Sequence, residues 1–211
     1  MGKVAITFDD GYVDNFEYAY PILKKHKIPV SIFLTTAFVG TSGDWQLNNV
    51  AELAYKRKYI SEKKLSTLCQ RYHFLKREEW MRLLKIKEGD LNEPSENHGL
   101  NWEQINEMIT SGLVRFECHG HWHDNLAYKS REEVIEDIQK NKYLLKEKLG
   151  IESKVFAYPF GGDWDINPIV LDVLKKLGFK AAVKAMGRSN TMKTSLYELD
   201  RITVTAEHSF L

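Results

Sequence analysis

The chain has 211 residues, 43% of them hydrophobic, and a formal net charge of +1. These values fit one globular domain, residues 1–211, and the near-neutral charge gives no sign of a nucleic-acid partner. Two distant cysteines, Cys69 and Cys118, exclude a disulfide scaffold and a cysteine-based zinc motif. With no bilayer-spanning apolar run and no signal-peptide pattern, the sequence as written predicts a cytoplasmic protein; a removed leader would instead imply a secreted or cell-envelope protein.

The first predicted strand is the apolar run Val4-Ala5-Ile6, which leads into Thr7-Phe8-Asp9-Asp10-Gly11. The pattern predicts a buried strand that delivers two acids to its carboxyl end, where parallel α/β folds place their functional sites. Neighbouring side chains on an extended backbone point to opposite sides, so Asp9 and Asp10 should have different roles. Taken alone, the same residues also fit an ordinary strand end followed by an Asp-Gly turn.

A helix follows, with apolar residues at helical spacing from Phe16 to Leu23, and Pro29 then opens a second strand over 30–34. Strand, helix and strand in succession predict a right-handed parallel crossover. Residues 41–99 are rich in Lys, Arg and Glu and predict a helical insertion on the rim of the fold. Its cations favour a solvated helix surface over a site for an anionic polymer or membrane.

The next predicted helix spans 101–108, and a strand over 113–116 leads into a histidine cluster. His119 and His123 are four residues apart, a spacing that can bring two imidazoles to one metal ion, whereas His121 would point elsewhere in a regular helix. Any single histidine here fits a polar loop. A histidine cluster and a carboxylate pair at two strand ends together favour a metal site.

A capping box of Ser130 and Glu133 opens a helix that Gly150 closes. A strand over 155–158 then enters a turn fixed by a proline and two glycines. The remaining pattern predicts a helix over 169–177 and strands over 179–183 and 201–204. This alternation of strands and helices predicts an α/β protein with a parallel sheet.

Three of these stretches together resemble the polysaccharide deacetylases, the NodB-type domain of carbohydrate esterase family four. The first is Thr7-Phe8-Asp9-Asp10-Gly11, the second is His119 with His123, and the third is Tyr158-Pro159-Phe160-Gly161. The resemblance covers nearly the whole chain. It implies a distorted, incomplete (β/α) barrel and the removal of N-acetyl groups, as acetate, from the amino sugars of a poly- or oligosaccharide.

The resemblance also implies roles for individual residues. Asp10, His119 and His123 would bind a divalent metal, Asp9 would be the general base, and the backbone N–H of Phe160 would stabilise an oxyanion. Zinc is the expected metal, with cobalt, nickel, manganese and iron as alternatives. Two histidines and one aspartate leave coordination positions open, which suits activation of water and polarisation of an amide carbonyl.

Other positions depart from the family pattern. Many members have an arginine where this chain has Ala157, and we expect Arg201 to orient the base instead. Gly120 replaces the usual serine or threonine after the first metal histidine, so another group must brace that loop. The family's Leu-x-His motif for the general acid is absent from the sequence, and His121 and His208 are the candidates for its role.

Aromatic residues are the candidates for contact with the N-acetylated glycan that the resemblance implies as substrate. Tyr158 and Pro159 lie in the third motif, and Trp164 and Trp122 could wall the sugar or the acetyl methyl group, although either tryptophan also fits a core position. The sequence specifies neither the natural sugar nor the oligomeric state.

Two other functions remain open at this point. A carbohydrate-binding protein that retains the metal but has lost catalysis would account for the absent acid motif. The two-histidine, one-carboxylate set also occurs in non-haem iron oxygenases. An oxygenase would leave Asp9 without a task, and that class usually has a β-sandwich rather than alternating strands and helices.

Overall fold

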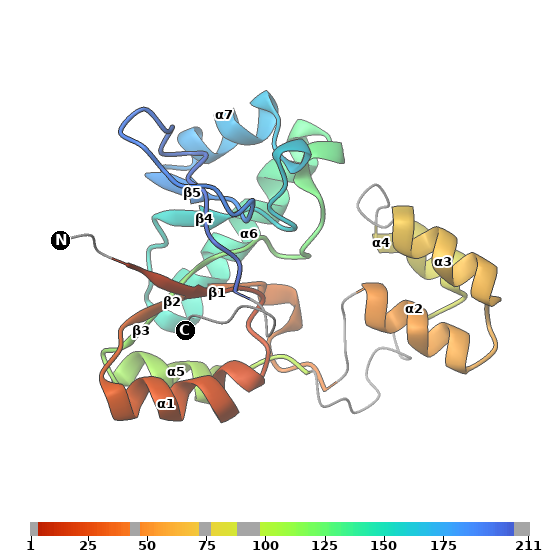
Figure 1. The fold of residues 1–211 in the computed structure, drawn as a ribbon, viewed down its shortest axis with the longest axis horizontal. Coiled ribbons are helices and arrows are strands. Elements are labelled where there is room, and N and C mark those ends of the chain that lie inside the picture. The colour runs from red at the N-terminus through yellow and green to blue at the C-terminus, as the bar shows by residue number, and fades with distance from the viewer. Residues whose placement is uncertain (1–3, 43–46, 72–76, 88–97, 205–211) are drawn as a thin grey trace.

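The computed structural model describes residues 4–42, 47–71, 77–87 and 98–204, and these form a curled parallel sheet surrounded by helices (Figure 1). Five strands pair in sequence order and all neighbours are parallel. They are β1 Ile6–Phe8, β2 Val30–Leu34, β3 Val114–Cys118, β4 Val155–Ala157 and β5 Ala181–Val183. This arrangement confirms the predicted incomplete (β/α) barrel.

Four helices accompany the sheet: α1 Tyr20–His26, α5 Trp102–Thr110, α6 Arg131–Leu149 and α7 Pro168–Lys176. In Figure 1, α1 and α5 lie below β1 to β3, and α7 lies at the other end beside β5. The predicted capping box of α6 is confirmed, because the Ser130 side chain accepts from Glu133 N while the Glu133 side chain accepts from Ser130 N. Gly150 closes the same helix in the left-handed conformation.

The described part of the predicted insertion contains three helices, α2 Leu47–Lys56, α3 Glu62–Arg71 and α4 Arg77–Leu84, which Figure 1 shows to the right of the sheet. They bury a small core of their own, which includes Val50, Trp80 and Leu84. Three parts of the insertion, 43–46, 72–76 and 88–97, lie outside the described residues. The assignment of the whole chain to one domain stays a prediction.

Two strand predictions are wrong. The opening strand is not buried: Val4 is 91% exposed and precedes the strand, and Ile6 is 40% exposed. The cause is its position at the edge of an open sheet, with β2 as its only neighbour among the described strands. Residues 201–204 form no strand, and the last pairing is a single bridge between Val183 and Leu199.

The main core lies between the sheet and its helices and contains the fully buried Ile32, Phe116 and Phe156. The pairing of β2 with β3 places Ile32 opposite Phe116. Cys118 is opposite Phe156, which brings the carboxyl ends of β3 and β4 to one edge. Within the described part of the chain, no helix combines the length and apolar composition needed to cross a bilayer.

Candidate metal centre and neighbouring base

The two adjacent acids at the end of β1 separate because the backbone turns sharply there. Asp10 has φ of 73° and Gly11 has φ of 87°, and the Gly11 N–H donates to Asp9 O at 2.8 Å. A Cβ on Gly11 would lie 2.3 Å from Leu34 Cδ1, so only glycine fits the turn. The turn sends the Asp10 carboxylate towards β3 and leaves Asp9 to face a different partner.

Asp10 lies against two imidazoles that come from the loop after β3. Its Oδ1 is 3.3 Å from His119 Nε2 and 3.2 Å from His123 Nε2. One ligand atom of Asp10, one of His119 and one of His123 all lie within 4.8 Å of one another. The structure therefore brings together the three residues predicted to hold a metal, and a carboxylate oxygen with two imidazole nitrogens suits a divalent first-row cation.

The His119 ring is oriented by a second contact on its far side. His119 Nδ1 lies 2.8 Å from the carbonyl oxygen of Ala157 in β4. A carbonyl can only accept, so Nδ1 carries a proton, and Nε2 is the nitrogen that faces Asp10 and is free to bind a metal when the ring is neutral. Such a carbonyl contact is the usual device that fixes a metal-binding histidine in one tautomer and one orientation.

Asp10 and His119 of the cluster shift each other's pKa values, and both shifts favour the charged form. Burial raises the pKa of Asp10, but the neighbouring His123 and His119 outweigh that effect and lower it below the ordinary value. Burial lowers the pKa of His119, whereas Asp9 and Asp10 raise it by a larger total, so the net pKa is above the usual value. The raised pKa of His119 favours a second proton on the ring, at Nε2, and binding of a metal to that nitrogen would displace it.

Asp9 is held by Arg201, which is 192 residues away in the chain. The guanidinium forms two parallel hydrogen bonds to the carboxylate, Nη1 to Oδ1 and Nη2 to Oδ2, both 2.7 Å long. Arg201 is itself fixed, because Nη1 also donates to Thr7 Oγ1 and Nε donates to Lys184 O. This bidentate contact fits the predicted orienting role, although the role itself stays a prediction.

Asp9 also lies close to the candidate metal ligands, with Oδ2 3.9 Å from His119 Nε2. Burial raises the pKa of Asp9, but His119 and Arg201 together lower it by more, so the net pKa is below the ordinary value. Asp9 is therefore an ionised carboxylate beside the cluster, which is the state that a general base requires.

The third sequence motif supplies a wall of the site from the loop after β4. Phe160 has φ of 66° and its ring centroid lies 4.9 Å from that of His123. Trp122 and Trp164 are 39% and 59% exposed, which leaves both rings accessible to a ligand. Pro159 is buried against the second-motif loop, where its Cγ lies 3.7 Å from the position of a Cβ on Gly120.

Tyr158 does not reach the surface. Its side chain is 1% exposed, its ring packs on Phe156, and its hydroxyl donates to Tyr197 O at 2.8 Å. A buried side chain that is held in this way cannot contact a glycan, so the prediction that Tyr158 binds substrate is wrong for the side chain. The residue belongs to the core that supports the third motif.

Of the two general-acid candidates, His208 lies outside the described residues and His121 points to another partner. His121 Nδ1 is 2.9 Å from Thr36 Oγ1. Burial, with a smaller contribution from Lys140, lowers the pKa of His121 to about 4. The ring is therefore neutral at pH 7 and is a poor source of a proton there.

The sequence reasoning missed two acids that hold the site loops. Asp137 of α6 accepts from the backbone N–H groups of His121 and Trp122. Asp165 accepts from Gly162 N at 2.7 Å and from Asn125 Nδ2 at 2.6 Å, which ties the third-motif loop to the second. The sequence did contain a signal for Asp137, because an aspartate falls at a position on the buried, apolar face of α6, where an acid needs hydrogen-bond partners.

A family model for polysaccharide deacetylase matches residues 2–182. The chain belongs to the polysaccharide deacetylase family. The match covers the strand that supplies Asp10 and the loop that supplies His119 and His123, which confirms the resemblance drawn from the motifs. Arg201 lies beyond the matched residues.

Curated relatives of the chain include the poly-beta-1,6-N-acetyl-D-glucosamine N-deacetylase of Staphylococcus aureus strain MRSA252. The two are 24% identical over 210 residues, which cover 96% of this chain and 54% of the relative. The protein of the same name from Escherichia coli K12 is 23% identical over 176 residues, or 83% of this chain and 24% of the relative. The chain thus spans about half the length of the Staphylococcus relative and less of the other.

Solved structures support the same fold. Streptococcus pyogenes deacetylase PplD, in complex with acetate, superposes with a TM-score of 0.64 at 20% identity over 95% of this chain and 64% of that chain. IcaB from Ammonifex degensii gives a TM-score of 0.59 at 24% identity over 98% of this chain and 70% of that chain. At these identities the likeness shows the shared fold alone.

Proposed function

We propose that the chain is a metal-dependent hydrolase that removes N-acetyl groups, as acetate, from an amino-sugar polymer or oligomer. The observation that carries this proposal is the convergence of Asp10, His119 and His123, with the arginine-bound Asp9 beside them. The names of the curated relatives favour poly-N-acetylglucosamine as the substrate class.

In this proposal Asp10, His119 and His123 hold a divalent cation, with zinc favoured by the nitrogen-rich ligand set. When bound, the cation would lower the pKa of a water molecule and polarise the acetamide carbonyl. Asp9 would accept a proton from the attacking water as the water oxygen bonds to the acetyl carbon, and the acetyl C–N bond would then break to release acetate and an amine that takes up a proton from solvent. Arg201 keeps the Asp9 carboxylate ionised and aimed during this transfer.

The backbone N–H of Phe160 is the proposed donor to the oxyanion that develops on the acetamide oxygen. Two facts support this role. Phe160 and Gly161 both have positive φ, 66° and 74°, so this backbone departs from the strand direction. The Phe160 ring lies against His123, which keeps the loop next to the cluster. Trp122 and Trp164, both exposed, are the proposed sugar contacts.

The alternative of a metal-retaining glycan-binding protein with lost or weak catalysis has one supporting observation. His121, the candidate general acid within the described residues, faces Thr36, and its pKa is about 4. The oxygenase alternative loses support, because the sheet is parallel and Asp9 has a defined partner in Arg201.

Acetate release tests the proposal against its alternative. The chain, stripped with chelator and reloaded with zinc or cobalt, is offered β-1,6-linked and β-1,4-linked N-acetylglucosamine oligomers and the monomer. We expect acetate from at least one oligomer, dependent on added metal and abolished by chelator. Binding of oligomers without acetate, at full metal occupancy, would support the binding protein instead.

Substitution of Arg201 tests the positioning of the base. Arg201→Lys replaces two parallel donors by one mobile ammonium, so we expect acetate turnover to fall roughly 10- to 100-fold with metal content unchanged. The acidic limb of the rate profile should move to higher pH, because Arg201 lowers the pKa of Asp9. Arg188→Lys is the matched control, since Arg188 is 53% exposed and pairs with Asp163. Equal turnover in both variants would contradict the role of Arg201.

A further inference from the structure

The loop between the two candidate metal histidines has an unusual backbone. Gly120 has φ of 79° and His123 has φ of 56°, so the chain enters the left-handed region twice within four residues. For a non-glycine residue such as His123 this conformation is unfavourable unless the surroundings impose it. Some other group must therefore hold the loop in the shape that places His123 next to His119.

Asp137 of α6 is the group that contacts this loop from inside the protein. Its Oδ1 accepts from His121 N at 2.8 Å and its Oδ2 accepts from Trp122 N at 3.0 Å. A Cβ on Gly120 would lie 2.9 Å from Asp137 Oδ1, so the carboxylate fills the space where a side chain would project. Asp137 is 4% exposed, and hydrogen bonds to a buried carboxylate are among the stronger ones in proteins.

One turn further along α6, Asn141 contacts the segment after β2, and through Thr36 of that segment it acts on His121. Asn141 Nδ2 donates to Leu34 O at 3.0 Å and to Thr36 Oγ1 at 2.9 Å. Thr36 Oγ1 therefore has its own proton left for His121 Nδ1, 2.9 Å away. The buried face of α6 thus fixes the backbone and the ring of His121, the residue midway between the two metal histidines.

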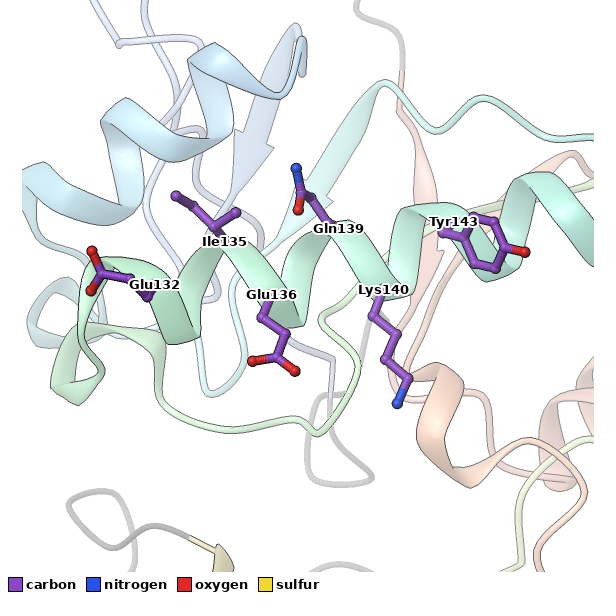
Figure 2. Close-up of a pocket in the computed structure, with 6 residues that line it drawn as sticks. All are labelled: Glu132, Ile135, Glu136, Gln139, Lys140 and Tyr143. Atoms are coloured by element: carbon purple, nitrogen blue, oxygen red, sulfur yellow. The ribbon is translucent and has the colours of Figure 1, made fainter.

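The opposite face of α6 is open to solvent and carries mostly polar side chains. Figure 2 shows an open hollow on that face, lined by Glu132, Ile135, Glu136, Gln139, Lys140 and Tyr143. Of these, Lys140 reaches the loop, with its Nζ 5.7 Å from the centre of the Trp122 ring. The contacts that define the loop backbone therefore come from the buried face, where Asp137 and Asn141 stand with Val134 and Ile138.

We propose that Asp137 is a positioning residue that holds the turn between His119 and His123 in its metal-binding shape. The proposal rests on the proposed function, since it assumes that these histidines bind a cation. The hydrogen bonds of Asp137 go to His121 and Trp122, which lie between the two histidines. Asp137 acts through the two backbone N–H groups that lie between the histidines, so the loop is already ordered when the metal binds. It also supplies the brace that the Gly120 position lacks in this chain.

Asp137→Asn tests the proposal because it keeps the size of the side chain and removes one of its two acceptors. The amide NH₂ would face a backbone N–H, so one of the two contacts must open. We expect affinity for zinc, measured by competition with a chelator, to fall roughly 10- to 100-fold. The visible spectrum of the cobalt-loaded chain should change as well, because His123 no longer takes a single position. Asp137→Glu, which restores both acceptors, should recover part of the affinity.

Asp172→Asn is the matched control, since the Asp172 side chain on α7 is 40% exposed and pairs with Arg131 and Lys176. Its zinc affinity and cobalt spectrum should equal those of the wild type. If Asp137→Asn binds zinc as tightly as the control with the same spectrum, the positioning role is overturned. If Asp137→Asn does not fold, equal affinities of Asp137→Glu and Asp137→Ser overturn it. Failure of the wild type to bind metal would instead refute the metal centre itself.

Discussion

Asp9→Asn should retain the metal but lose acetate release, with turnover reduced about 10²- to 10⁴-fold, the usual contribution of a general base. The amide has nearly the shape of the carboxylate but cannot accept a proton from water. Asp9 is also not among the candidate ligands, which are Asp10, His119 and His123. The measurements are steady-state acetate release and metal content of the same preparation.

Asp14→Asn is the control for this prediction. Asp14 is an exposed aspartate five residues further along the chain, next to the first helical segment, Asn15–Ala19. The same chemical change there should leave turnover and metal content at wild-type values. Full turnover in Asp9→Asn would remove Asp9 from the mechanism. Loss of metal together with turnover would indicate that Asp9 is a ligand instead of a base.

His119→Ala should lose both metal and activity. Zinc sites with four ligands have binding free energies of about 10–16 kcal/mol, so one ligand is worth roughly 3 kcal/mol, or about two orders of magnitude in affinity. His119 is 2% exposed and bridges Ala157 O to the Asp10 carboxylate, so its removal also opens a cavity that the remaining ligands cannot close. Zinc titration and acetate release both measure the loss.

His26→Ala controls for the loss of a histidine. His26 is exposed in the last turn of α1. Its removal should change zinc affinity by less than the error of the titration. Retention of tight zinc binding by His119→Ala would contradict the proposed ligand set. Comparison with Asp9→Asn separates the two roles, because only the histidine variant should lose the metal.

The sequence alone predicted the fold class and the three side chains that converge at the candidate metal centre. Strand and helix periodicity gave a parallel α/β architecture, and the strand ends of such a sheet meet at one edge. That rule was sufficient to predict that Asp10, His119 and His123 converge, because each follows a strand in the pattern. The capping box at Ser130 and Glu133 was equally readable, since it depends on residues three apart.

The tertiary structure decided the parts that depend on loop conformation and on distant residues. Local periodicity says nothing about positive φ at Asp10 or His123, yet these angles aim both side chains. It also could not place the Tyr158 side chain in the core or turn His121 towards Thr36.

Long-range contacts formed the rest of the site. Arg201 reaches Asp9 from 192 residues away, and it does so from an irregular segment where a strand was predicted. Asp137 reaches the histidine loop from a neighbouring helix. Spacing in a sequence reports only neighbours within a strand or a helix turn, whereas these contacts exist because packing of the sheet and helices brings separate segments together.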